Sequence, residues 1–258
     1  MNLKVSPVPL TQERQWMNHN IEAIFLDVGN TLRIVIEDKD FMANAKKQLV
    51  ELTGAQMPPD EFYALLEERY KVLRKRAKEM LVEASEKEMW TKWMLPDFPA
   101  EKIGSLSGKL TRLWRDSDGR RVPRPDVKKI VTELSKRGYV LGIIANTITE
   151  TEIPDWLETD GLTGYFKTVI LSSKLGIRKP NPEIYLEAAR RIGVEPEYCV
   201  YVGDNPVRDV EGVHAAGFGM SIILVEPATL KKEPPRGDIK PDKFILELTE
   251  LLDIFPPR

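Results

Sequence analysis

The chain has 258 residues, of which 42% are hydrophobic and 30% are charged, and its formal net charge is −2. These proportions are typical of a globular protein that folds around a sizeable core, in one or two domains, and they exclude a disordered chain. Because basic residues are not in excess, the composition also argues against a nucleic-acid partner.

The start of the sequence carries no recognisable targeting signal. The first twenty residues lack the apolar stretch of a signal peptide, and no run in the chain approaches the length of a membrane span. We therefore expect a cytoplasmic protein that does not associate with a membrane.

The first predicted element is a buried strand over residues 21–27, because this run is mostly apolar and β-branched. It ends at Asp27 and is followed by a tight turn, Val28-Gly29-Asn30-Thr31-Leu32. In open α/β sheets, ligands bind at the carboxyl edge of the strands, which is where this carboxylate would lie. Asp27 is therefore a candidate covalent nucleophile, a candidate metal ligand, or both.

A helical segment follows, from about Glu37 to Arg120, with few strand signals. The spacing of apolar residues predicts helices over 41–50, from Pro58 onward, around 85–94 and over 100–114. Large aromatic side chains dominate cores, so we expect most of those in this segment to pack between its helices: Phe62, Trp90, Trp93 and Trp114.

From residue 126 to the end, helices and strands alternate. Helices are predicted over 126–136, 150–158, 180–192, 206–216 and 244–254, and strands over 140–145, 168–171, 199–202 and 220–225. A surface loop is predicted over 227–241. The single cysteine, Cys199, lies in a strand, which indicates an unreactive core thiol, and one cysteine excludes an internal disulfide or a cysteine-rich zinc site.

This alternation predicts right-handed βαβ units and a parallel sheet. The expected architecture is an α/β fold with a doubly wound parallel sheet and an inserted α-helical domain. The core would comprise residues 20–36 and 120–258, and the helical insertion residues 37–119.

Polar residues follow four of the predicted strands. Besides Asp27 they are Asn146, Lys179, Asp204 and Asp209, and in a doubly wound sheet all of these strand ends meet on one rim. Carboxylates gathered at one point repel one another unless a cation or a proton relieves them, and oxygen ligands favour Mg²⁺. With a lysine to attract an anion, the set outlines a phosphoryl-transfer site.

In order and position, these segments resemble the haloacid dehalogenase (HAD) superfamily, whose members are mostly phosphatases. Four stretches carry the resemblance: Asp27 to Leu32, Ile143 to Asn146, Gly176 to Pro182, and Val202 to Asp204 with Asp209. It covers the chain from about residue 21 to the end. It implies a Rossmann-like core, and the helical insertion falls where that family has a helical cap.

The resemblance also implies roles. Asp27 would take up a phosphoryl group as an aspartyl phosphate, and Lys179 would neutralise Asp27 and the phosphate. Asp204 would bind Mg²⁺, with Asp209 as a further ligand or directly behind it, and Asn146 would face the substrate.

Further residues beside these stretches are candidates for the same site. Gly29 can offer its backbone carbonyl to Mg²⁺, and Asn30, Arg33 and Thr147 are candidate substrate contacts. Arg178 and Arg208 are next to Lys179 and Asp209 in the sequence, where they would serve as phosphate contacts or as surface charge. Residues of the insertion are candidates to contact the leaving group: Trp90, Lys92, Trp93, Trp114 and Arg115.

The chain departs from the family pattern at two positions. Phosphatases of the family usually carry a second Asp two residues after the nucleophile, as a general acid, where this chain has Gly29. They usually have Ser or Thr where this chain has Ala145. General acid–base help is worth about 10²–10⁴ in rate, so its loss would leave a slow enzyme or one limited to good leaving groups.

Three functions remain open. The first is a Mg²⁺-dependent phosphohydrolase acting on a small phosphorylated molecule. The second is a 2-haloacid dehalogenase-type hydrolase, because halide leaves without a proton; dehalogenases, however, typically have Tyr at position 29 and lack the acidic pair. The third is a catalytically degenerate protein that binds an anion or a partner. A monomer and a homodimer both fit the sequence.

Overall fold

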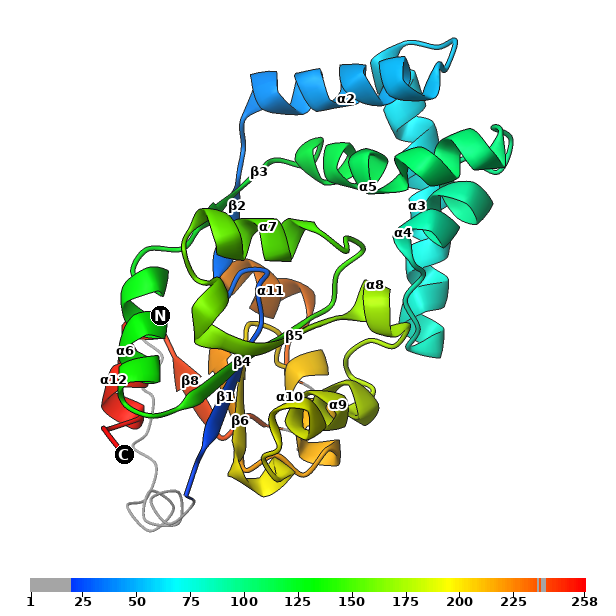
Figure 1. Cartoon of the computed structure of the whole chain (residues 1–258). Coiled ribbons are helices and arrows are strands. Elements are labelled where there is room, and N and C mark those ends of the chain that lie inside the picture. The colour runs from blue at the N-terminus through cyan, green and yellow to red at the C-terminus, as the bar shows by residue number, and fades with distance from the viewer. Residues whose placement is uncertain (1–19, 236, 238–239) are drawn as a thin grey trace, which may run out of the picture.

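A six-stranded parallel sheet lies at the centre of the computed structural model, which describes residues 20–235, 237 and 240–258 (Figure 1). Its strand order is β5-β4-β1-β6-β7-β8, and every neighbouring pair is parallel. The strands are β1 (Ala23–Leu26), β4 (Val140–Ala145), β5 (Phe166–Leu171), β6 (Cys199–Gly203), β7 (Met220–Leu224) and β8 (Lys243–Ile245).

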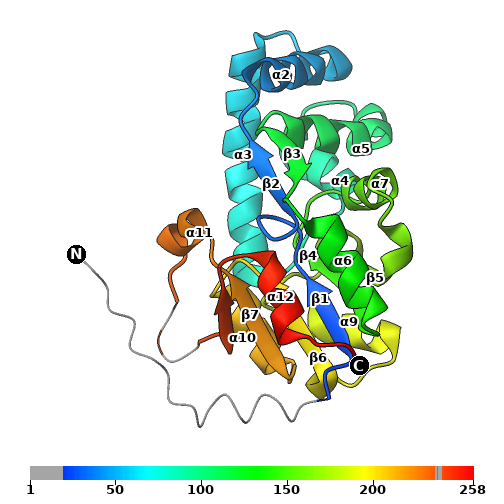
Figure 2. The same cartoon turned by 90° about the vertical axis from the view of Figure 1, so that its left-hand side faces the viewer.

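Helices cover both faces of this sheet, so the predicted doubly wound α/β fold is confirmed (Figures 1 and 2). One face packs against α6 (Val127–Lys136), α7 (Glu152–Thr159) and α12 (Leu251–Ile254). The other packs against α9 (Pro182–Ile192) and α10 (Arg208–Ala215). The shorter helices are η2 (Thr163–Tyr165), α8 (Ser172–Leu175), η3 (Pro196–Tyr198), α11 (Pro227–Lys232) and η4 (Leu248–Glu250).

The central strands form because their residues are apolar on both faces, as expected for a parallel sheet between two helical layers. Every residue of β1, β6 and β7 is buried. Gly142 in β4 lies against Phe25, since a Cβ at this position would come within 2.5 Å of the phenylalanine ring. Cys199 is fully buried, and burial raises the pKa of its thiol to about 12, in agreement with an unreactive core residue.

The strand order reverses between β1 and β6. Strands β4 and β5 lie on one side of β1, and β6, β7 and β8 lie on the other. The crevice at such a reversal, outside the carboxyl ends of the strands, is where ligands bind in open α/β sheets. Asp27 follows β1 and Asp204 follows β6, so both lie at this crevice.

A helical insertion lies between two short antiparallel strands, β2 (Arg33–Ile36) and β3 (Arg120–Pro123) (Figure 2). It comprises α2 (Lys39–Thr53), α3 (Pro59–Met80), α4 (Glu86–Glu88), the π-helix η1 (Met89–Met94) and α5 (Ala100–Asp116). These helices enclose a hydrophobic core of their own, which includes Phe62, Trp90 and Trp114, with Trp93 packed against it. The aromatic residues therefore pack as predicted, although Trp114 also borders a cavity.

The insertion contacts the sheet domain at a second place, after α3. Val82 forms an antiparallel bridge with Ile177, flanked by hydrogen bonds from Glu83 N to Gly176 O (3.0 Å) and from Arg178 N to Leu81 O (3.1 Å). The Glu83 carboxylate lies 3.2 Å from the Arg178 guanidinium. The loop that leads to Lys179 is thus held against the insertion.

Three features of the fold differ from the sequence predictions. Residues 243–254 are not one helix: Ile245 is buried between exposed Phe244 and Leu246, and this alternation makes β8, followed by η4 and α12. The predicted loop over 227–241 contains α11. The pair β2–β3 was not predicted, because each strand has only four residues, begins with arginine and is at most half-buried.

Two predictions concern the chain's location. No helix in the described part of the chain is long and apolar enough to span a bilayer. The prediction about a signal peptide rests almost entirely on residues 1–19, which lie outside the described residues. The division into a core and an insertion at residues 37–119 stays a prediction.

Candidate active site

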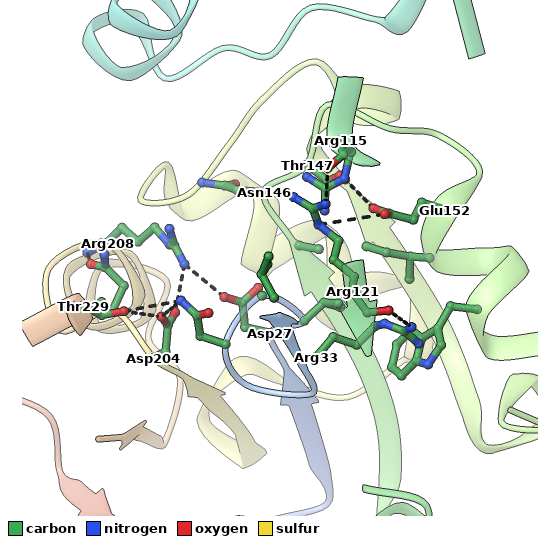
Figure 3. A pocket seen from close by; sticks show the side chains of 18 of the residues that line it. Asp27, Arg33, Arg115, Arg121, Asn146, Thr147, Glu152, Asp204, Arg208 and Thr229 are labelled. Atoms are coloured by element: carbon green, nitrogen blue, oxygen red, sulfur yellow. Dashed lines mark hydrogen bonds and ion pairs between the residues drawn. The ribbon is translucent and has the colours of Figure 1, made fainter. Parts of the chain in front are cut away.

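Asp27 lies directly after β1, at the floor of a cavity of about 370 Å³ (Figure 3). Its backbone N–H donates to Val202 O on the neighbouring strand (2.8 Å), which fixes where the chain leaves the sheet. The turn that follows is closed by hydrogen bonds from Leu32 N and Arg33 N to Val28 O (2.9 and 2.8 Å). The Asp27 side chain is only 4% exposed, so its negative charge requires partners within the protein.

Lys179 provides one of these partners. Its side chain is completely buried, and Nζ lies 3.1 Å from Asp27 Oδ1 and 3.0 Å from Asp209 Oδ1. Nζ also donates to the Tyr201 hydroxyl, which in turn donates to Ile144 O (3.1 Å). All three contacts of the ammonium group are with oxygen, which is the arrangement a buried charge requires.

Asn146 holds the backbone of Lys179. Its Oδ1 accepts from Lys179 N (2.8 Å) and its Nδ2 donates to Lys179 O (3.0 Å). The residue lines the cavity, as expected from the sequence, but both polar atoms of its side chain are engaged in positioning the lysine. Its predicted contact with substrate stays a prediction.

Asp204 and Asp209 follow β6 and have different surroundings. Asp209 is fully buried and its Oδ2 accepts from Asn205 N (3.0 Å). Burial acts to raise the pKa of Asp209, but the charges of Arg208 and Lys179 outweigh it and lower that pKa. Gly203 is required beside it, because a Cβ there would come within 2.4 Å of Asp209 Oδ2.

The Asp204 carboxylate faces the cavity and is less well compensated. Its Oδ2 accepts from Asn30 Nδ2 (3.0 Å) and from Thr229 Oγ1 (2.8 Å). Burial, and then the negative charge of Asp27, raise the pKa of Asp204 to about 6. The site therefore favours additional positive charge at this point.

Arg208 supplies the second cation, a role that the sequence left open. Its Nη2 lies 3.0 Å from Asp27 Oδ2 and 3.1 Å from Asp204 Oδ1 (Figure 3). Its Nε lies 3.2 Å from Asp209 Oδ1. Burial lowers the pKa of Arg208, but the three carboxylates together raise it well above its ordinary value. Unlike Lys179, the side chain is 29% exposed, so it can be displaced from the cavity side.

The carboxylates are suited to a divalent cation. Asp27, Asp204 and Asp209 each offer an oxygen, and the three ligand atoms lie within 4.8 Å of one another. Hard oxygen donors of this kind suit Mg²⁺. Asp27 and Asp204 are the better placed of the three, because the oxygens of Asp209 already contact Lys179, Arg208 and a backbone N–H.

The remaining candidates from the sequence are distributed around the cavity. Gly29 is exposed, and a Cβ added to it would meet no atom within 4 Å. Thr147 lines the cavity, and its Oγ1 accepts from Thr149 N (3.2 Å). Arg33 also lines it, with its guanidinium 4.7 Å from the Trp156 ring and Nη2 donating to Arg121 O (2.6 Å).

Among the insertion residues proposed to contact a leaving group, Arg115 lines the cavity. Trp90 does not, because it is fully buried in the core of the insertion and donates to Thr111 Oγ1 (2.8 Å). Lys92 pairs with Glu88 on the surface of the insertion.

Asp27 pairs with Lys179 and Arg208, and the other carboxylates that line the cavity also have partners within the described residues. Glu152 contacts Arg115 and Arg121, Glu233 contacts Lys78 and Asn205, and Asp204 contacts Arg208. The described lining thus contains no unengaged carboxylic acid that could donate a proton.

Residues 21–217 match the haloacid dehalogenase-like hydrolase family. Among curated proteins, the glyceraldehyde 3-phosphate phosphatase of Methanopyrus kandleri is 36% identical over 134 residues, which is 51% of this chain and 56% of that protein. The chain therefore spans about half the length of the curated relatives it matches.

Two solved structures show the fold over nearly the whole chain. A 2-haloacid dehalogenase from Pseudomonas syringae pv. Tomato DC3000 superposes with a TM-score of 0.64 at 22% identity, covering 91% of this chain and 97% of that chain. A HAD phosphatase from Thermococcus onnurineus superposes with a TM-score of 0.61 at 24% identity, covering 92% of this chain and 99% of that chain.

The buried lysine should be a strong determinant of stability. We expect Lys179→Met to lower the free energy of unfolding by about 3 kcal/mol, because the substitution leaves buried carboxylates without one of their two cations. Urea denaturation of both proteins measures this difference. Lys174→Met, at an exposed position five residues earlier, is the control and should change stability by less than about 0.5 kcal/mol. Equal losses in the two variants would contradict the assigned role.

Proposed function

Because the chain belongs to the haloacid dehalogenase-like hydrolase family, we propose that it is a Mg²⁺-dependent phosphohydrolase acting on a small phosphorylated molecule. One observation carries the proposal: the carboxylate of Asp27 lies at the floor of a cavity, between a buried ammonium and a guanidinium group. The two cations attract an anionic substrate to this carboxylate, which would act as the nucleophile.

The reaction would run in two steps on Asp27. Its carboxylate oxygen attacks phosphorus while the bond from phosphorus to the leaving oxygen breaks, and the leaving oxygen takes a proton from water. Water then attacks phosphorus, the bond between phosphorus and the Asp27 oxygen breaks, and inorganic phosphate leaves. Lys179 and Arg208 offset the negative charge that gathers at phosphorus, which is the main requirement of phosphoryl transfer.

Asp27 and Asp204 would hold Mg²⁺, with Asp209 behind them. When bound there, the ion would supply positive charge to the phosphoryl oxygens. Asn30 and Thr229 hold Asp204 in place from the cavity side. Gly29, through its carbonyl, stays a predicted further ligand.

The leaving group decides how fast this site can work. With Gly29 in place of an acid and every other described carboxylate of the lining engaged, an alkoxide would have to take its proton from water rather than from a side chain of the described lining. Phenolate and acyl leaving groups need little protonation. We therefore expect a slow enzyme, or one that acts on good leaving groups, and we expect it as a monomer or a homodimer.

A second candidate function is hydrolytic dehalogenation. It is favoured by Arg208, whose guanidinium contacts all three aspartates and balances them without a metal, and by Gly29, since halide needs no proton. A protein that binds anions without turnover is the third possibility.

The purified protein with Mg²⁺ should hydrolyse p-nitrophenyl phosphate, measured as release of nitrophenolate. Asp27→Asn should lower the rate at least about 1,000-fold, because it removes the nucleophile. The control Asp253→Asn, at an exposed position, should retain the wild-type rate. Turnover that continues in excess chelator would exclude the metal-dependent mechanism. Halide release from a 2-haloacid without metal would favour dehalogenation.

Gly29→Asp should restore proton donation, because a side chain at this position meets open space. We expect a gain of about 10-fold or more on alkyl phosphates, and little change on p-nitrophenyl phosphate, whose leaving group needs no acid. Gly29→Asn is the matched control, with the same shape and no acid. Equal gains on both substrate types would show that the effect is not acid catalysis.

Arg208→Asn should strengthen Mg²⁺ binding, since the arginine and the ion compete for the same oxygens of Asp27 and Asp204. We expect the dissociation constant, measured by isothermal titration calorimetry, to fall about 10-fold, as it would for a loss of about 1.4 kcal/mol of competition. Arg208→Lys keeps the charge and should bind Mg²⁺ more weakly than Arg208→Asn. An unchanged constant in Arg208→Asn would argue against competition.

A further inference from the structure

The cavity above Asp27 continues into a second one, of about 360 Å³, that reaches the helical insertion. Residues that line both are Arg74, Arg115, Arg121, Asn146, Thr147 and Arg208. Beyond them the second cavity is lined by aromatic side chains, with the Trp114 ring 5.1 Å from that of Tyr63 and 5.6 Å from that of Tyr70. A molecule with its phosphoryl group at Asp27 that is long enough to enter the second cavity would pass these arginines.

Among the residues that the structure describes, the wall shared by the two cavities contains four arginines and no carboxylate. Arg115 Nε lies 2.5 Å from Glu152 Oε2, and Arg121 Nε lies 3.9 Å from Glu152 Oε1, so two guanidinium groups share one carboxylate (Figure 3). The other carboxylates near Arg121 are Asp118, at 3.5 Å, whose side chain is 72% exposed and therefore screened by water, and Asp116, whose charge acts on Arg121 from beyond ion-pair distance.

Arg74 adds a third guanidinium group to this wall. Within residues 20–235, 237 and 240–258 it forms no ion pair. Across the same ranges, the terminal nitrogens of Arg115 donate no hydrogen bond, since only its Nε is engaged. The donors that a guanidinium group uses to hold a carboxylate or a phosphate are thus available on both residues.

Holding these guanidinium groups close together is electrostatically unfavourable when no anion is bound. The Arg121 side chain is only 14% exposed, and burial, followed by the positive charge of Arg115, lowers its pKa to about 10. Like charges held together away from water repel, and an anion placed between them removes the repulsion. Arg33 donates to the carbonyl of Arg121 but has Asp160 as its own partner, which sets it apart from Arg74, Arg115 and Arg121 as a candidate for binding an anion.

We propose that Arg74, Arg115 and Arg121 form a subsite for a second anionic group, so that the substrates are phosphorylated molecules that also carry a carboxylate or a second phosphate. The proposal rests on the proposed function and narrows its substrate class. Glu152 positions Arg115 and Arg121, and the aromatic residues beyond them close the end of the cleft.

Aryl phosphates with similar phenolate leaving groups test this subsite. We would measure kcat/KM for phenyl phosphate, 4-carboxyphenyl phosphate and 1,4-phenylene bisphosphate with the wild-type protein and Mg²⁺. The second anion should raise kcat/KM about 10- to 100-fold, mainly through KM, as one or two charge-assisted hydrogen bonds would. A larger effect of the carboxylate than of the second phosphate, or the reverse, identifies which anion the subsite prefers.

Variants then localise the effect. Arg115→Met and Arg74→Met should each reduce the preference for the second anion about 10-fold, and Arg115→Lys should retain part of it. Arg112→Met is the matched control: Arg112 lies one turn earlier on α5, pairs with Asp155 and lines neither cavity, so the wild-type preference should remain. The proposal would be overturned if the wild-type protein had equal kcat/KM for the compounds with and without a second anion. It would also be overturned if Arg115→Met left the preference for the second anion intact.

A binding measurement separates this proposal from the function on which it rests. If no aryl phosphate is hydrolysed, the proposed function is wrong, and calorimetric binding of the same compounds still tests the subsite. Tighter binding of 4-carboxyphenyl phosphate than of phenyl phosphate, lost in Arg115→Met and kept in Arg112→Met, would support it. Equal binding of the two compounds would reject it.

Discussion

The buried charge balance around Asp27 is the constraint on which the site depends. Three carboxylates at the ends of two neighbouring strands are tolerable only because Lys179 and Arg208 lie among them. The two cations differ in kind. The Lys179 side chain is enclosed, and the Asn146 amide holds the backbone of this residue in place. Arg208, in contrast, reaches the aspartates from the cavity side. The first is a fixed part of the site, and the second occupies a place that other positive groups can take.

The sequence predicted the members of this site because strand ends are easy to recognise in it. Asp27 and Asp204 directly follow buried strands and Lys179 lies in the segment that follows β5, and a doubly wound sheet must bring such ends together. It did not predict what each side chain contacts. Asn146 carries the signal of a substrate contact, yet its amide holds the Lys179 backbone, which depends on a loop conformation that no spacing encodes.

Residues in helices were harder to assign from the sequence. Arg208 could be a solvated surface charge, and only the orientation of α10 turns it toward three carboxylates. Glu152 and Thr229 carry no motif at all, although both hold groups of the cavity wall. The pair β2–β3 and the strand β8 were missed for a related reason, because short, half-exposed strands lack the apolar run that marks a buried one.

Backbone pairing links the helical insertion to the sheet domain at two places. One is the pair β2–β3, and the other is the bridge between Val82 and Ile177. Ion pairs between the insertion and the sheet domain add to these links, among them Arg115 with Glu152 and Lys78 with Glu233, so lifting the insertion away would break them as well as the hydrogen bonds beside Arg178. Because Arg178 precedes Lys179 directly in the chain, any lifting would also disturb the ammonium group at the nucleophile. Opening the cleft for a small molecule by lifting the insertion would therefore also shift the positive charge beside Asp27.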